Sequence, residues 1–208
     1  MKTRNWRTAL LALLALASTA SAEDAADVLL KQVYAGGGKT LYCGVEFKPG
    51  ERGIEADSIY DSKSLLRQFG CITSRQCGRK PDYAAVANDL HGLYPIQRSV
   101  VVDRRGSQFG NVPAGAGEND CGYQTSFQTF SPPDQAKGNV ARAMIYMHRQ
   151  HRLPLLGTLQ MYQQWNQLDP PDEEERKRNS AIARIQGNSN PYIDKPALMD
   201  DLGTLPGR

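Results

Sequence analysis

The segment 170–194, PPDEEERKRNSAIARIQGNSNPYID, constrains the fold of this chain more than any other stretch. Two prolines start it, acidic residues fill positions 172–175, and basic residues follow, an order that suits the dipole of a helix. Ile182 and Ile185 are expected to face inward, and Gly187 is expected to end the helix. The charged run itself is interpreted as a solvated helix end. The segment therefore predicts a helix that docks through one apolar face.

The rest of the chain mixes short extended segments with helices. Helices are expected over residues 24–34, 62–69 and 82–90, and again from residues 137 and 154 onward. Extended segments are expected over 40–47, 54–60, 99–102 and 121–130, and a glycine-rich loop over 105–117. These elements predict an α+β domain with a predominantly helical C-terminal half. Its length suits a single domain over residues 23–208.

The first 22 residues have the features of a secretory signal. Basic residues lie at the start, residues 10–17 are apolar, and Ala20, Ser21 and Ala22 form a small-residue cleavage site. Cleavage after Ala22 would start the mature chain at Glu23, in the periplasm or in the medium. The apolar run is shorter than the ~20 residues that a membrane helix needs, so no membrane anchor is expected.

Removal of this segment also removes the basic character of the chain. The whole sequence has 25 Lys and Arg against 22 Asp and Glu, and three of the basic residues lie in the signal. The mature chain is therefore formally neutral and lacks the overall basic charge typical of nucleic-acid binding. A local patch remains compatible with this balance, and Arg75, Arg79 and Lys80 form a small basic cluster that could contact a phosphate backbone.

Four cysteines, Cys43, Cys71, Cys77 and Cys121, remain in the mature chain. An even number in an oxidising compartment predicts two disulfides, and three pairings are possible. We favour Cys71–Cys77 as a local loop and Cys43–Cys121 as a long one. A zinc site is the alternative, but the sequence has neither a Cys-x-x-Cys pair nor a nearby histidine.

Several segments occur in an order that resembles one family. They are Leu41–Gly44, Ala87–Pro95, Arg105–Gly106 with Phe109–Gly110, Lys137–Met147, Trp165–Asn166 and Asp169–Pro171, followed by the segment 170–194. Together they resemble the endonuclease I family, secreted bacterial nucleases that cut DNA and often RNA with a divalent metal. The resemblance spans nearly the whole mature chain. It implies a ββα-metal (His-Me finger) core wrapped by several helices.

The resemblance also implies one-metal hydrolysis, in which a histidine takes a proton from the attacking water. An adjacent acidic residue and a distant asparagine help to hold the metal, and magnesium suits such a site because it keeps waters and substrate phosphates in its shell. At these positions the chain has Asp57 for the acidic residue, Ser58 for the histidine and Val102 for the asparagine. Gly92 replaces a further asparagine. Serine has no useful basicity near neutral pH, and valine cannot bind a metal.

No shift of the alignment restores the missing histidine. The chain has three histidines, and none lies near residues 50–70. His91 belongs to its own motif, and His148 and His151 lie near the end of a predicted helix, where cationic residues are common. The sequence therefore predicts a degenerate catalytic motif.

Other polar residues have two interpretations each. His91 is either catalytic or a structural hydrogen-bonding histidine. Asp57, Asp61 and Asp103 either form a carboxylate metal site or carry surface charge. Arg105 either binds a phosphate through a bidentate contact or forms an internal salt bridge. Tyr60 and Tyr94 either stack on bases or are buried.

Three hypotheses follow for the activity. The first is an exported endonuclease I-family protein, expected to be a monomer, whose metal-dependent hydrolysis of DNA or RNA is weak or lost. The second is a non-catalytic module that binds nucleic acid or a protein. The third is a working hydrolase with a rebuilt site made of His91, Asp57 and Asp103, which requires these side chains to converge on one open spot.

Overall fold

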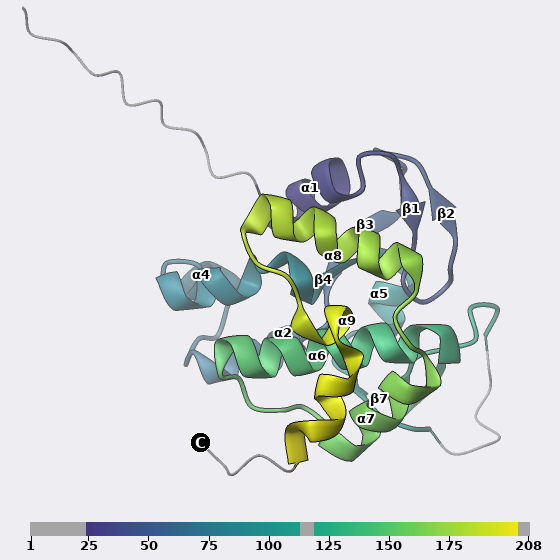
Figure 1. Ribbon diagram of the computed structural model, residues 1–208. Coiled ribbons are helices and arrows are strands. Elements are labelled where there is room, and N and C mark those ends of the chain that lie inside the picture. The colour runs from purple at the N-terminus through teal and green to yellow at the C-terminus, as the bar shows by residue number, and fades with distance from the viewer. Residues whose placement is uncertain (1–23, 113–118, 204–208) are drawn as a thin grey trace, which may run out of the picture.

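The computed structural model describes residues 24–112 and 119–203 (Figure 1). The predicted signal and the last five residues of the predicted loop 105–117 lie outside the described residues. Among the helices of the described ranges, none combines the length and apolar character needed to cross a bilayer.

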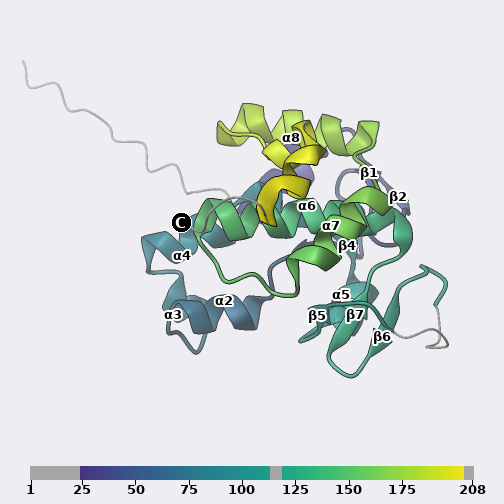
Figure 2. The same ribbon diagram turned by 60° about the horizontal axis from the view of Figure 1, so that its bottom comes forward.

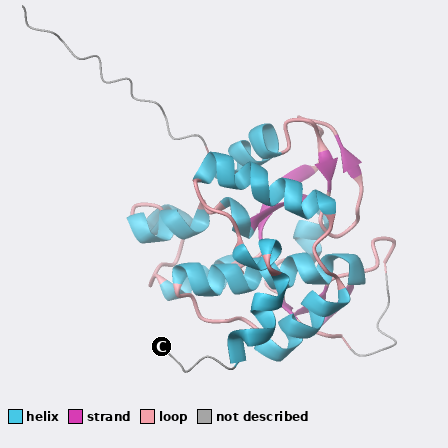
Figure 3. Cartoon of the chain, viewed as in Figure 1, coloured by secondary structure: helices cyan, strands magenta, loops and turns pink. Residues whose placement is uncertain are grey.

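The structure is a mixture of helices and three small sheets, which confirms the α+β class (Figure 3). The helices are α1 Ala25–Val28, α2 Ser62–Gln68, α3 Ser74–Cys77, α4 Pro81–Ala87, α5 Arg98–Arg104, α6 Asp134–His151, α7 Leu159–Leu168, α8 Glu173–Gln186 and α9 Pro191–Asp194, with shorter helical turns η1 Leu29–Val33, η2 Leu90–Gly92 and η3 Pro196–Gly203. The strands are β1 Gly38–Lys39, β2 Glu46–Phe47, β3 Ile54–Ser58, β4 Leu93–Gln97, β5 Gln108–Phe109, β6 Gln124–Ser126 and β7 Thr129–Ser131.

Helix α6 lies at the centre of the molecule. Figure 2 shows α8 on one side of α6 and the β5–β7–β6 sheet on the other. Every residue from Val140 to Met147 is buried, so α6 contacts neighbours on all sides. Gly138 permits the closest of these contacts, because a Cβ atom there would lie 1.8 Å from the Asp169 carbonyl oxygen. The core is therefore built around this helix rather than on the small sheets.

Strands β3 and β4 form an antiparallel pair, and α5 follows β4 directly. In this register Asp57 pairs with Tyr94 and Ser58 with Leu93. The start of β3 pairs with the end of β4 and so lies beside the start of α5. The contacts of Arg104 with Asp57 and Ser58 bring the other end of α5 to the end of β3.

Four predicted elements differ from the structure. The extended segment predicted over 40–47 is mostly a turn between β1 and β2, and only Glu46–Phe47 lie in a strand. Residues 99–102 lie in helix α5 rather than in a strand, because helical spacing turns both Val100 and Arg104 inward, and this burial outweighs the β-propensity of valine. The segment 121–130 is not one strand: it divides into β6 and the start of β7, joined by a tight turn. The helix predicted from residue 154 begins at Leu159, where the Thr158 hydroxyl caps its first turn.

The charged start of α8 is only partly a solvated helix end. Glu173 and Lys177 form an exposed pair, as expected for such an end. Glu175 and Arg178 are instead buried, and Glu175 binds Arg142 of α6. Ile182 faces inward as predicted, but Ile185 is 40% exposed, so that part of the prediction is wrong. Gly187 ends the helix in the left-handed conformation.

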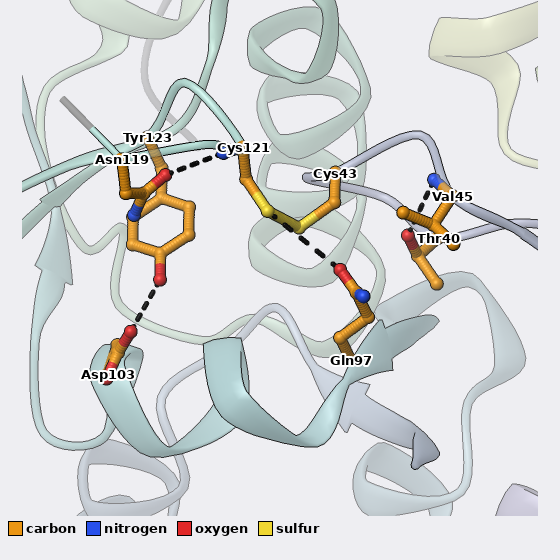
Figure 4. The surroundings of a disulfide bond; sticks show 8 residues. All are labelled: Thr40, Cys43, Val45, Gln97, Asp103, Asn119, Cys121 and Tyr123. Carbon is orange, nitrogen blue, oxygen red and sulfur yellow. Dashed lines mark hydrogen bonds between the residues drawn. A yellow bond between two sulfur atoms is a disulfide. The ribbon is translucent and has the colours of Figure 1, made fainter. Parts of the chain in front are cut away.

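Both favoured disulfides are present. Cys43–Cys121 joins residues 78 positions apart, and Cys71–Cys77 joins residues 6 positions apart. Figure 4 shows the long-range disulfide beside Gln97 of β4. Because all four cysteines are paired in this way, they leave no thiolate for the alternative zinc site.

Candidate active site

The end of β3 and the end of α5 form a small cavity. It has a volume of about 120 Å³, and the residues that line it are Asp57, Ser58, Asp61, Ser62, Lys63, Val101, Arg104, Arg105, Gly106 and Ser107. Asp61 caps the next helix, α2, because its carboxylate accepts a hydrogen bond from the Ser64 backbone N–H at 2.7 Å. The fold therefore brings three of the predicted site residues, Asp57, Ser58 and Arg105, to one cavity.

A guanidinium that the sequence analysis did not single out lies at the centre of this site. Arg104 is 8% exposed, and its Nε donates to the Asp57 carboxylate at 3.1 Å. Its Nη2 donates both to the same carboxylate and to the Ser58 carbonyl oxygen. The guanidinium also lies over the Phe109 ring, 5.4 Å from its centroid. The acidic side chain predicted to hold a metal is therefore already neutralised by the protein itself.

Ser58 is also committed to a contact within the chain. Its hydroxyl donates a hydrogen bond to the Tyr60 carbonyl oxygen at 3.0 Å. An alcohol that donates its proton to a carbonyl has no adjacent base to activate it as a nucleophile. The position is therefore polar but is not equipped for proton abstraction.

Val101, rather than Val102, faces the cavity. Val101 and Arg104 lie one helical turn apart on the same face of α5, and both line the cavity. The Val102 side chain is not part of this lining and is 55% exposed. An asparagine at position 102 would therefore point away from Asp57 in this structure.

His91 has a structural role. Its side chain is fully buried, its Nε2 lies 2.9 Å from the Asn188 carbonyl oxygen, and its ring centroid lies 4.7 Å from that of Tyr146. Burial lowers the pKa of His91 and outweighs the hydrogen bond to Asn188, which raises it. The histidine is therefore inaccessible to solvent and contacts a backbone carbonyl, which agrees with the structural interpretation.

The other two histidines also contact the protein interior. His151 Nε2 lies 2.7 Å from the Asp89 carboxylate, which also accepts hydrogen bonds from Tyr146 and Gln186. His148 Nδ1 lies 2.5 Å from the Leu153 carbonyl oxygen. Burial raises the pKa of Asp89, but the hydrogen bonds that its carboxylate accepts have the larger effect, so the pKa is lowered.

The residues of the rebuilt-site hypothesis do not converge. Asp57 contacts Arg104, and His91 contacts Asn188. Asp103 accepts a hydrogen bond from the Tyr123 hydroxyl at 2.5 Å, as Figure 4 shows. Asp57 lines the cavity, but neither His91 nor Asp103 does. The geometry that this hypothesis requires is absent from the described residues.

The residues at the cavity do not fit the magnesium ion that the resemblance implies. The described ranges contain no cluster of three or more His, Cys, Asp or Glu side chains able to hold a metal. A divalent cation at Asp57 would stand within a few ångströms of the Arg104 guanidinium. The repulsion between the two would be on the order of several kcal/mol.

Arg105 is an unpaired cation among the described residues that line the cavity. It is exposed, and its side chain has no hydrogen-bond or ion-pair partner within the described residues. The internal salt bridge that was its alternative interpretation is therefore absent there. Tyr60 donates to the Pro154 carbonyl oxygen, and Tyr94 lies under Arg178 with the guanidinium carbon 3.8 Å from the ring centroid. Both tyrosines are buried and unavailable for base stacking.

Burial of His91 predicts a loss of stability in mild acid. Because its pKa is lowered in the folded protein, the unfolded chain binds more protons below the usual value of 6.5, and stability falls as the pH falls through that value. The loss is at most about 1.4 kcal/mol per pH unit for one proton. We expect the melting temperature of the wild type to decrease as the pH is lowered from about 7.5 to about 5. The decrease should be smaller in a His91→Gln variant. Equal slopes for the two proteins would contradict this role of His91.

Most of the chain matches the model of one protein family. The family model for endonuclease I matches residues 39–197, which include the whole cavity and the helices around it. This chain belongs to the endonuclease I family. An extracellular deoxyribonuclease of Aeromonas hydrophila is 28% identical over 202 residues, which cover 82% of this chain and 87% of that protein.

Other relatives of this endonuclease I-family chain include two types of nuclease. A periplasmic deoxyribonuclease of Aeromonas hydrophila is 31% identical over 150 residues, covering 68% of this chain and 63% of the relative. An extracellular ribonuclease of Bacillus amyloliquefaciens is 28% identical over 145 residues, covering 57% of this chain and 47% of the relative. The chain is thus matched over about half to two thirds of the length of these two proteins.

Proposed function

We propose that this protein is an exported endonuclease I-family member whose cleavage activity is weak or lost. On this proposal β3, β4 and α5 form the ββα-metal core of an ancestral enzyme that hydrolysed DNA or RNA phosphodiester bonds with magnesium. The observation that carries the proposal is the contact of Arg104 with Asp57 and the Ser58 carbonyl oxygen. A guanidinium there replaces the cation on which the ancestral chemistry depended.

Two chemical deficits support the loss of activity. The first is the missing base: Ser58 stands where the family has a histidine, and general-base catalysis typically contributes about 10²–10⁴-fold to the rate. The second is the missing metal site, because Arg104 holds the Asp57 carboxylate and the Asp61 carboxylate caps α2. Each deficit alone would slow hydrolysis, and together they remove both the general base and the charge stabilisation.

Export is proposed from the signal-like residues 1–22 and from the extracellular and periplasmic relatives. The two disulfides agree with an oxidising compartment. We further propose a monomer that retains contact with nucleic acid, since Arg105 and Lys63 offer unpaired positive charge at the cavity. A purely protein-binding module on the same scaffold is the alternative, and no contact described above favours it.

A nicking assay tests the proposal. Mature protein is incubated with supercoiled plasmid in the presence of magnesium or of a chelator. We expect no more relaxed or linear plasmid with magnesium than with chelator. Chelator-sensitive nicking that falls in Asp57→Asn, and that is unchanged in Lys177→Ala on the distant surface of α8, would contradict the loss of activity.

A further inference from the structure

A larger groove continues from the cavity at Asp57 and Ser58. It has a volume of about 790 Å³ and shares Asp61, Lys63 and Gly106 with that cavity. One wall comes from α2 and the loop after it, and the other from β5 and the turn between β6 and β7. Figure 2 shows these two groups of elements facing each other below α6 and α7. The two hollows therefore form one path along the surface.

Two large apolar side chains that line this path are almost fully exposed to solvent. Phe127 is 89% exposed and Ile72 is 88% exposed, whereas the next most exposed large hydrophobic residues in the described ranges reach only 55%. Both line the larger groove, from opposite walls. Large apolar side chains that gather on an exposed surface commonly mark an interaction site.

Phe127 lies in a tight turn between two strands. Ser126 pairs with Thr129, so Phe127 and Gln128 form a two-residue turn between β6 and β7. Gln128 adopts a positive φ of 55°, a conformation that glycine or asparagine favours at such turns. The sequence thus keeps a large aromatic ring and a strained residue where small turn residues are usual. Local folding does not explain this choice.

The unpaired charge along the path is positive. Asp61 is committed to its cap of α2, and Asp57 to Arg104. Lys63 and Arg105 are exposed and have no hydrogen-bond or ion-pair partner within the described residues. Arg67 adds a third cation, whose side chain donates a hydrogen bond to the Ser64 hydroxyl and forms no ion pair within the described residues. A ligand in this groove would therefore meet cations and an aromatic ring.

We infer that this groove binds single-stranded nucleic acid, with a base stacked on Phe127 and phosphates on Lys63, Arg67 and Arg105. Stacking needs a base that is not paired inside a duplex, and an aromatic ring open to solvent offers the required π-face. The inference rests on the proposed function, because it takes the path from Asp57 to Phe127 as the nucleic-acid face of the scaffold. An acidic peptide would use the cations but would gain little from an open aromatic face.

The charge of the groove sets the expected salt dependence. Three phosphate contacts on a single strand predict a slope of about −2 for the logarithm of the binding constant against the logarithm of salt concentration. Removal of one cation should make the slope less steep by about 0.7. A formally neutral mature chain adds no large non-specific term to this value.

Fluorescence anisotropy with a labelled oligothymidylate of about 20 nucleotides tests the inference. The mature full chain is titrated in chelator and at about 50 mM salt, so that no cleavage occurs. We expect Phe127→Ala to weaken binding about 10-fold and Phe127→Tyr to retain it. Lys63→Ala should weaken binding and reduce the salt slope. Leu168→Ala and Lys177→Ala are matched controls, since one removes an exposed apolar residue and the other an exposed cation outside the groove.

Two results would overturn the inference. Equal affinity of the wild type and Phe127→Ala for the oligonucleotide would show that no base stacks on Phe127. Stronger binding of a labelled poly-glutamate peptide than of the oligonucleotide would assign the groove to a protein partner. Magnesium-dependent nicking would instead contradict only the proposed loss of activity, because the binding measurement is made in chelator.

Discussion

Replacement of Arg142 by methionine is expected to lower the free energy of unfolding by about 3–5 kcal/mol. Arg142 is fully buried, and its Nε and Nη2 bind the two carboxylate oxygens of Glu175 at 2.9 and 2.5 Å. Its Nη1 donates to Asn166 and to the Asp169 carbonyl oxygen. One guanidinium thus joins α6 to α7 and α8. Its loss would leave a buried acid whose pKa burial already raises, without the partner that lowers it.

Urea denaturation followed by circular dichroism measures this loss. Lys177→Met is the matched control, because Lys177 forms the exposed pair with Glu173 on the same helix and its removal should change stability little. The double variant Arg142→Met/Glu175→Leu should recover much of the loss, because no unpaired charge is then buried. If the urea concentration at the unfolding midpoint were as high for Arg142→Met as for Lys177→Met, the buried pair would not hold the helices together.

The double variant Ser58→His/Arg104→Asn is expected to gain magnesium-dependent nicking, about 100-fold above the wild type. The first change supplies a base at the end of β3. The second removes the guanidinium from Asp57 and leaves an amide oxygen opposite the carboxylate, and magnesium accepts both as ligands. Both changes are needed, because a histidine beside an intact Arg104–Asp57 pair would have no metal with which to act.

Ser58→His/Val102→Asn is the matched control for this gain. It introduces the same base and the asparagine that the family resemblance calls for, but Val102 is exposed and does not line the cavity. Arg104 still holds Asp57, so we expect no gain. Nicking by this control equal to that of Ser58→His/Arg104→Asn would contradict the role given to Arg104. No gain in either variant, with the far-ultraviolet spectrum unchanged, would contradict the position given to the metal.

The sequence allowed good prediction of those parts of the fold that rest on local chemistry. The glycine that ends α8 and the class of the fold follow from residue types and their spacing. The even cysteine count predicts two disulfides, and the favoured one of the three possible pairings is present. Helix α5 was mistaken for a strand because three consecutive valines favour extended backbone, and only the contact with β3 reveals which face is buried. Glu175 and Arg178 look like surface charges in the sequence because their buried partners lie on distant elements.

The sequence predicts that the candidate site lacks a histidine, but it does not predict that Arg104 binds Asp57 there. A count of three histidines suffices to show that none is available for the end of β3. Arg104 gave no comparable signal, since it stands beside Arg105 in a basic dipeptide and only one of the two turns inward. Which arginine meets Asp57 depends on the rotation of α5 about its axis, and that rotation is set by the burial of Val100 against the core.

The ion pair between Arg104 and Asp57 also bears on the history of this lineage. Loss of Arg104 alone leaves the Asp57 carboxylate without its partner. A histidine at position 58 alone would lie beside an Asp57 carboxylate that Arg104 still binds. Neither single step toward the ancestral chemistry brings an advantage, so selection has no gradual path back. On the proposed loss of activity, this ion pair acts against a return to cleavage and leaves the other surfaces of the scaffold free to diverge toward other tasks.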